Sequence, residues 1–254
     1  MEGVEATKAS TPISITTLSI DKAISKISNN TASGADNICI EHLKLAHPSV
    51  IQILKNVFNI FITLGEVPAG FGIGIVTPIP KFKGFKVKVK ADDFRGVTLN
   101  SILSKFFEHC LHPFFDSLSS SSSSRQFGFK KGLGCLHAIN SVKSTIQFFN
   151  KKGNTVNLGL IDVRKAFDKV NFWSILTMLQ NKEINASIID VMEHWFFISS
   201  VQIKWVDSLS SPVKLLAGVR QGSILSPLLF SSYVDCLLHE LEKTNMGCFV
   251  HGQC

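Results

Sequence analysis

An apolar run that ends in a single aspartate constrains the fold of this chain more than any other feature. Residues 158–170 read LGLIDVRKAFDKV, in which Asp162 follows the apolar run and precedes residues of helical character. A short apolar run after a Gly-Asn turn signal is typical of a buried strand. The pattern therefore predicts a strand over residues 156–161 that presents Asp162 at its end. Such a carboxylate suits a divalent cation, but it also suits the N-cap of a helix.

The remaining chain mixes helical and strand patterns. Apolar residues at helical spacing predict helices over residues 21–27, 49–64, 102–110, 136–149, 172–179, 186–198 and 227–241. Residues 74–80, 97–99, 200–206, 213–216 and 246–254 read as strands, with 200–206 and 213–216 as a pair. No regular strand–helix–strand repeat is present, so the predicted fold class is α+β. The serine run at 119–124 is predicted to be a flexible surface loop.

Composition narrows the classes of protein. The 254 residues are 45% hydrophobic and 18% charged, which excludes a disordered chain. A net charge of +7 suits a polyanionic partner, and five lysines crowd into residues 81–90, KFKGFKVKVK. No segment has the length of a membrane span, and the start lacks the pattern of a secretory signal. We therefore interpret the six scattered cysteines as reduced thiols of an intracellular protein with no membrane partner.

A second motif follows at residues 218–227, GVRQGSILSP. Taken singly, its residues and those around Asp162 have ordinary structural explanations. Gln221 and Gly222 form a turn signal, and Phe167 is a candidate core aromatic. Arg95 would be a solvated surface residue. Only the order of the motifs along the chain favours a functional interpretation.

Four motifs in order resemble those of reverse transcriptases from non-LTR retrotransposons of the LINE and jockey type. VTPIPKFKG and then DDFRGVTLNSILSKFFE resemble the fingers motifs, and RQFGFKKGLGCLHAI resembles the Gln-Phe-Gly-Phe element. Residues 162–170 resemble motif A, and GVRQGSILSPLLF resembles motif B. The resemblance implies a right-hand polymerase fold without a thumb, with an antiparallel sheet packed on helices. It divides the chain into a loose lead-in (1–20), fingers (21–155) and a partial palm (156–254).

The resemblance also implies roles around motif A. Asp162 would bind the catalytic metals, with the carbonyl of Val163 as a main-chain ligand. Lys165 and Ala166 would offer backbone N–H groups to the incoming triphosphate. Phe167 would form an aromatic gate beneath the sugar, where a 2′-OH would clash.

Further roles fall on the fingers and on motif B. Arg95 would grip the triphosphate, since a planar guanidinium suits phosphate oxygens. Lys81 would assist it, although five lysines compete for that role. Gln221 and Gly222 would pack against the nucleotide sugar and the template–primer.

One expected motif is not found. The family carries a Tyr/Phe-x-Asp-Asp hairpin, motif C, and no such sequence follows Pro227. The ADD tripeptide at residues 91–93 precedes motif A and is interpreted as a pair of loop aspartates. Because one aspartate cannot hold two metals, we expect this chain by itself to lack significant polymerase activity.

The resemblance implies an intact enzyme that extends a DNA primer with deoxynucleoside triphosphates on an RNA template. A two-metal mechanism with Mg²⁺ or Mn²⁺ is implied, and so is a nuclear location. The alternative is a truncated relic that binds RNA non-specifically through its basic fingers. An exposed strand edge over residues 246–254 would predict aggregation.

Overall fold

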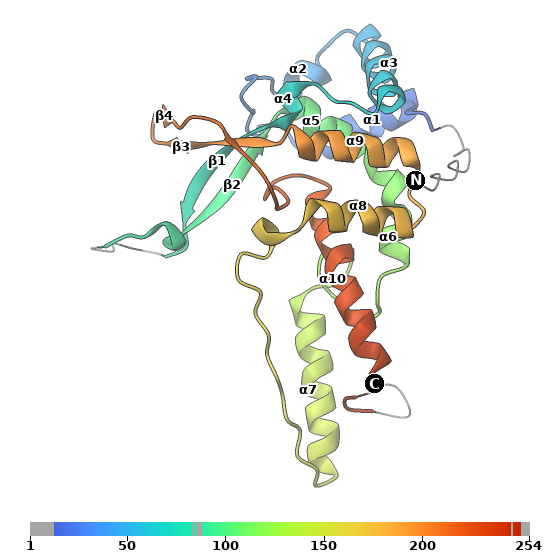
Figure 1. Ribbon diagram of the computed structural model, residues 1–254, viewed down its shortest axis with the longest axis vertical. Coiled ribbons are helices and arrows are strands. Elements are labelled where there is room, and N and C mark those ends of the chain that lie inside the picture. Colours follow the sequence, from blue (N-terminus) through green and yellow to red (C-terminus); the bar gives the residue numbers. More distant parts are fainter. Residues whose placement is uncertain (1–12, 83, 85–87, 245, 250–254) are drawn as a thin grey trace, which may run out of the picture.

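The computed structural model describes residues 13–82, 84, 88–244 and 246–249. Figure 1 shows a head of packed helices, a sheet that projects from one side, and α7 and α10 extending away from the head. The helices are α1 (Thr17–Lys26), α2 (Ile40–Lys44), α3 (Ser49–Leu64), α4 (Ala69–Gly72), α5 (Ile102–Leu111), α6 (Asp116–Ser120), α7 (Cys135–Lys151), α8 (Phe172–Asn181), α9 (Ala186–Phe197) and α10 (Ser226–Lys243). Short 3-10 turns are η1 (Ala91–Asp93), η2 (His112–Phe115) and η3 (Phe167–Lys169).

The strands form one mixed sheet. They are β1 (Ile73–Pro80), β2 (Phe94–Asn100), β3 (Ser200–Trp205), β4 (Ser208–Leu209) and β5 (Val213–Lys214). β1 pairs antiparallel with β2 and parallel with β3, and β3 pairs antiparallel with β4 and β5. The expectation of an antiparallel sheet is therefore wrong for the β1–β3 pair. A parallel pair needs a long crossover, and the helices α5–α9 between these two strands supply it.

The helices predicted from apolar spacing are confirmed. α3 spans Ser49–Leu64 as predicted and is followed by Gly65. α8 and α9 begin after Asn171 and Asn185, whose side chains accept hydrogen bonds from the first turn at 3.1 and 2.9 Å. α1 begins at Thr17, inside the range expected for the lead-in, and residues 1–12 lie outside the described part of the chain. The division between fingers and palm stays a prediction.

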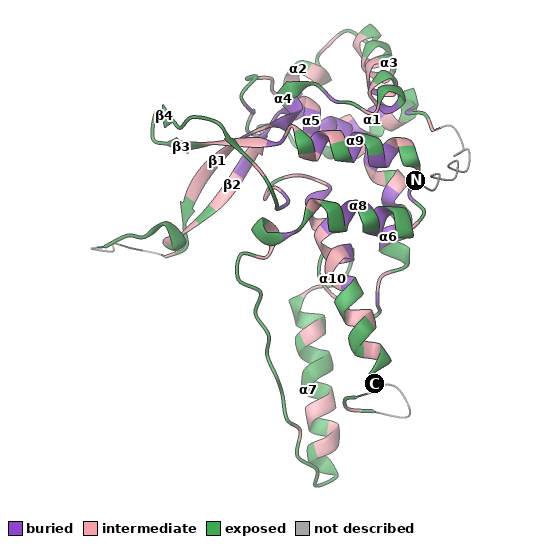
Figure 2. Cartoon of the chain, in the orientation of Figure 1, coloured by how far each residue is buried: buried purple, intermediate pink, exposed green. Residues whose placement is uncertain are grey.

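Aromatic packing centres the helical head. Phe58 of α3 lies with its ring centroid 4.8 Å from that of Phe107 and 5.4 Å from that of Phe106, both on α5. Trp195 of α9 stacks on Phe107 at 5.9 Å. Figure 2 shows that burial is concentrated in this head and that α7 has no buried residue. The sheet and the start of α10 are thus attached to a well-packed body.

The predicted strand over residues 156–161 is wrong. This segment has no strand pairing, and Leu160 and Ile161 are 88% and 90% exposed. An extended apolar segment becomes a strand only where a neighbouring backbone completes its hydrogen bonds. No described strand of the sheet pairs with residues 156–161. Local β-propensity alone did not supply that partner.

Two further expectations need correction. The serine run is not a free loop, because Ser119 and Ser120 end α6 and Ser123 is buried. The backbone N–H of Ser123 donates to the Asp235 carboxylate of α10 at 2.9 Å. Residues 246–249 form no strand, and residues 250–254 lie outside the described part of the chain. The aggregation expected of that edge stays untested.

Candidate functional site

An open cleft of about 920 Å³ brings together three main segments that are far apart in the sequence. They are the β1–β2 region, residues 162–168 and the turn at residues 221–222, and Phe129 adds a single further residue to the lining. The lining contains all nine residues singled out by the sequence, namely Lys81, Arg95, Asp162, Val163, Lys165, Ala166, Phe167, Gln221 and Gly222. It also contains Asp92, Phe129, Arg164 and Asp168, to which the sequence analysis gave no role in binding.

A tight turn separates Asp162 from Phe167. Lys165 has φ +54°, a left-handed conformation that is uncommon for a residue with a side chain. The backbone N–H of Asp168 then donates to the Lys165 carbonyl at 3.1 Å, and η3 begins at Phe167. The Phe167 ring is partly buried, with its centroid 4.8 Å from that of Phe230 on α10. Phe167 is therefore both a packed aromatic and a wall of the cleft.

Two backbone hydrogen bonds join this turn to the loop of residues 218–225, here called the QG loop. Gly218 N–H donates to the Val170 carbonyl at 2.7 Å, and Val219 N–H donates to the Phe167 carbonyl at 2.8 Å. Gly218 has φ +93°, and a Cβ there would lie 2.9 Å from backbone atoms of Asp168. Only glycine permits this approach, so Gly218 sets the spacing between the two segments.

The tip of the QG loop lies against β2. Thr98 N–H donates to the Gln221 carbonyl at 2.7 Å. Gly222 has φ +129°, and a Cβ there would lie 2.4 Å from the Thr98 carbonyl oxygen. The Gln-Gly pair thus forms the turn that its residue types indicate, and the turn stands at the edge of the cleft.

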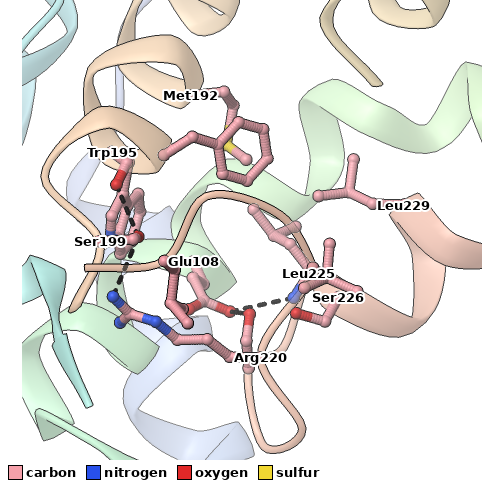
Figure 3. A pocket seen from close by; sticks show the side chains of 13 residues that line it. Glu108, Met192, Trp195, Ser199, Arg220, Leu225, Ser226 and Leu229 are labelled. Carbon is pink, nitrogen blue, oxygen red and sulfur yellow. Dashed lines mark hydrogen bonds between the residues drawn. The ribbon is translucent and has the colours of Figure 1, made fainter. Parts of the chain in front are cut away.

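Arg220, next to Gln221, points away from the cleft into the protein (Figure 3). Its guanidinium donates to the Phe71 carbonyl at 3.0 Å, the Gly72 carbonyl, the Ser199 hydroxyl at 3.0 Å and the Asn100 side-chain oxygen at 3.4 Å. Burial lowers the pKa of Arg220 to about 10, against the opposing effect of the nearby Glu108 carboxylate. The group therefore remains charged at neutral pH.

Glu108 of α5 receives the other end of the QG loop. Its carboxylate accepts from the Ser223 hydroxyl at 2.6 Å, from Leu225 N–H at 3.0 Å and from Ile224 N–H. Burial raises the pKa of the Glu108 carboxyl, while these donors oppose the shift. The carboxylate satisfies N–H groups at the start of α10, which otherwise lack intrahelical partners. Sequence reasoning missed this role because the donors lie 115 to 117 residues away.

Asp92 closes part of the cleft by ion pairs. Its carboxylate lies 2.9 Å from Arg164 and 3.1 Å from Lys165. The hydrogen bond and charge of Lys165, with the charge of Arg164, lower the pKa of Asp92. The Lys81 ammonium also donates to the Asp92 carbonyl at 2.9 Å. The ADD tripeptide, predicted as a pair of loop aspartates, forms the 3-10 turn η1 in the connection from β1 to β2 and bridges that connection to the turn after Asp162.

The lining offers oxygen donors of the kind that Mg²⁺ prefers. Asp162 and Asp168 supply carboxylates and Val163 a carbonyl, and Mg²⁺ is often bound by one or two carboxylates plus substrate phosphates. Among the described residues no group of three or more His, Cys, Asp or Glu side chains is arranged to hold a metal. The donor set fits a metal that arrives with a phosphate ligand.

The family of this chain follows from its match to a known protein family. Residues 79–251 match the family described as reverse transcriptase (RNA-dependent DNA polymerase). The chain belongs to the reverse transcriptase family. The match spans the three segments that line the cleft, from Lys81 to Gly222.

The relatives of this reverse transcriptase chain come from non-LTR retrotransposons, which confirms the resemblance to that group. It is 28% identical to the probable RNA-directed DNA polymerase from transposon X-element of Drosophila melanogaster, over 84% of this chain and 24% of that protein. The RNA-directed DNA polymerase from the mobile element jockey, also of Drosophila melanogaster, is 25% identical over 89% of this chain and 25% of that protein. The chain thus spans about a quarter of the length of these two relatives.

In the described part of this reverse transcriptase chain, no helix combines the length and the apolar character that a bilayer crossing requires.

Proposed function

We propose that the cleft binds the incoming deoxynucleoside triphosphate of an RNA-directed DNA polymerase that extends a DNA primer on an RNA template. The convergence of nine motif residues from three distant segments in one open cleft carries this proposal. The family match and the names of the relatives support the same reaction class. Nothing in the described residues favours the alternative of a relic that only binds RNA.

The charges of the cleft suit a triphosphate. Arg95, Lys81, Arg164 and Lys165 all line it, and guanidinium and ammonium groups form strong hydrogen bonds with phosphate oxygens. The Asp92 carboxylate pairs with both Arg164 and Lys165 and offsets part of their positive charge. We infer that the phosphates displace this carboxylate, so that Lys165 and the backbone N–H of Ala166 become ligands of the nucleotide.

Phe167 is proposed to select the sugar. Its ring is held from behind by Phe230 at 4.8 Å, and Val219 N–H fixes its carbonyl at 2.8 Å. A ring fixed on two sides cannot retreat from an additional hydroxyl group. A 2′-OH against this wall would clash, which favours deoxynucleotides over ribonucleotides.

Mg²⁺ or Mn²⁺ is the proposed cofactor, held by the Asp162 carboxylate and the Val163 carbonyl. Such ions supply electrostatic stabilisation of the attacking and leaving oxygens in phosphoryl transfer. The residues of this chain do the positioning. Asp162 would hold the cation beside the phosphates, and the QG loop would limit the position of the sugar and the base pair.

Two further proposals concern the chain as a whole. Because motif C is not found in this sequence, we propose that the chain by itself does not polymerise. Since retrotransposon polymerases serve insertion into chromosomal DNA, we also propose a nuclear location. Primer extension on an RNA template with Mg²⁺ tests the first point, and clear incorporation of deoxynucleotides would refute it.

Nucleotide binding tests the cleft without requiring catalysis. A fluorescent dATP analogue should bind the full chain in the presence of Mg²⁺ at least about tenfold more tightly than the matching ribonucleotide. Asp162→Asn and Arg95→Ala should each weaken binding about tenfold, the size of one lost charged contact. Arg125→Ala is the matched control, since Arg125 lies outside the cleft lining and pairs with Glu242 at 3.6 Å. Equal binding of both sugars, or equal losses in all three variants, would refute the assignment.

A further inference from the structure

Two residues outside the cleft control its shape. We propose that Glu108 and Arg220 are positioning residues that hold Gln221 and Gly222 at the cleft edge by fixing both ends of the QG loop. Neither residue lines the cleft, so each acts through the backbone of the loop. The expected effect on nucleotide binding rests on the proposed function. The anchoring of the QG loop rests on hydrogen bonds alone.

Arg220 fixes the side of the loop that precedes Gln221. Its guanidinium reaches acceptors on three separate parts of the helical head and sheet: Phe71 and Gly72 at the end of α4, Asn100 at the end of β2, and Ser199 just before β3. A planar group with several donors in a fixed fork holds one orientation when all its acceptors are fixed. The residue next to Gln221 therefore cannot rotate without breaking several buried contacts.

Glu108 fixes the side of the loop that follows Gly222. The hydroxyl of Ser223 and the N–H groups of Ile224 and Leu225 all converge on the same carboxylate oxygen, Oε2. Glu108 is 4% exposed, so water does not compete for that oxygen. A buried carboxylate with three donors is a strong local constraint.

The turn between these two anchors has little freedom left. Thr98 N–H donates to the Gln221 carbonyl at 2.7 Å, and Gly222 lies where any side chain would meet the Thr98 carbonyl. Behind the loop is a small cavity of about 40 Å³, lined by Glu108, Arg220 and Ser199 among others (Figure 3). The Arg220–Ser199 and Glu108–Ser223 hydrogen bonds beside this cavity hold the loop from behind, in addition to the packing of the buried Val219 and Leu225.

A second buried carboxylate, Asp235 of α10, provides the matched control for Glu108 of α5. Asp235 is also 4% exposed and also accepts a backbone N–H, that of Ser123, at 2.9 Å. It anchors the serine segment and has no contact with the QG loop among its described hydrogen bonds and ion pairs. Loss of either carboxylate should lower the denaturation midpoint, but only loss of Glu108 should change the QG loop.

Hydrogen exchange provides the first measurement. On the full chain, Glu108→Ala should accelerate amide exchange over residues 221–225 by about tenfold or more, as expected when buried hydrogen bonds are lost. Glu108→Gln keeps an acceptor oxygen and should restore part of the protection. Asp235→Ala should accelerate exchange near Ser123 and leave residues 221–225 unchanged. Unchanged exchange at 221–225 in Glu108→Ala would overturn the proposal.

Nucleotide affinity provides the second measurement. The Mg²⁺-dependent affinity for the dATP analogue should fall about tenfold in Glu108→Ala, recover partly in Glu108→Gln and stay within twofold in Asp235→Ala. Losses that follow the denaturation midpoint equally at both positions would show a merely structural role and overturn the proposal. If the wild-type chain binds no dATP analogue, the proposed function fails, and the exchange measurement alone then decides whether Glu108 holds the loop.

Discussion

The two motif segments that meet at the cleft are supported in opposite ways. The QG loop is joined to α5, β2 and the end of α4 by hydrogen bonds, and its Val219 is 5% exposed. The segment that leads to Asp162 has no strand pairing over residues 156–161, and Ile161 is 90% exposed. Both segments carry motif residues, but only one of them is held by the described part of the fold.

A site residue can therefore be recognised from the sequence without being held in place by the fold. Asp162 is recognised by its neighbours in the sequence, yet the described hydrogen bonds and ion pairs tie its segment to the body only from Arg164 onward, through Asp92 and through the backbone bonds at Phe167 and Val170. The QG loop is both recognised and held. Substitutions should therefore change the free energy of unfolding strongly in the QG loop and weakly in the segment around Asp162.

The largest contrast should come from two glycines that receive the same methyl group. Gly222→Ala forces a Cβ to within 2.4 Å of the Thr98 carbonyl oxygen at φ +129°, and we expect a loss of about 4 kcal/mol in the free energy of unfolding. Gly159→Ala places its Cβ in open space, and we expect a change within about 0.5 kcal/mol. Urea denaturation of both variants measures this. Similar losses in both would show that the two sides are equally constrained.

The next contrast comes from two arginines. Arg220→Met removes a partly buried guanidinium and takes a hydrogen-bond donor away from the Gly72 carbonyl and the Ser199 hydroxyl, so we expect a loss of about 3 kcal/mol. Arg164→Met removes an exposed group whose described partner is the exposed Asp92. Its denaturation midpoint should be indistinguishable from that of the wild type. A comparable shift in Arg164→Met would contradict the comparison.

The sequence predicted the residues of the cleft because each lies in a local motif, and the helices because apolar spacing is a local signal. The same locality explains what it missed. Glu108 and Leu225 are 117 residues apart, and Ser123 and Asp235 are 112 apart, so no pattern within one segment indicates these contacts. The serine run looked unstructured because its composition is polar, but a distant carboxylate anchors it.

The strand predicted at residues 156–161 is an element that local sequence indicated but that did not form. Its residues have the right propensity, but pairing is a property of two backbones. The parallel pairing of β1 with β3 was likewise invisible, because it depends on the path of the five intervening helices. Local sequence thus indicated what each segment could become, and tertiary contacts decided which of those possibilities formed.

Acid should destabilise the fold on the QG-loop side of the cleft, through His109 of α5. Burial, together with the smaller effects of the Lys26 and His112 charges, lowers the pKa of His109 to about 4. The unfolded chain takes up this proton near pH 6.5, the folded chain only near pH 4. Stability from neutral His109 is therefore full above about pH 6.5 and is lost as the pH falls toward 4. Since the ring is only partly buried, we expect a loss of about 1 kcal/mol.

Urea denaturation at pH 7 and pH 4.5 measures this term. Glu108 has a raised pKa and contributes with the opposite sign, so the wild type alone does not isolate His109. His109→Gln has no titrating ring, and its stability should fall less than that of the wild type over the same interval. An identical fall in both proteins would contradict the assigned role of His109.

The smallest effect should come from the exposed apolar segment before Asp162. Ile161→Ser should change the free energy of unfolding by less than about 0.5 kcal/mol, because the side chain is 90% exposed. Val219→Ser, at a 5% exposed position of the QG loop, should cost about 2 kcal/mol. Removing an exposed apolar group should also reduce self-association, which light scattering measures. A loss above about 1 kcal/mol in Ile161→Ser would mean that this segment packs against the body, and the contrast between the two sides of the cleft would then fail.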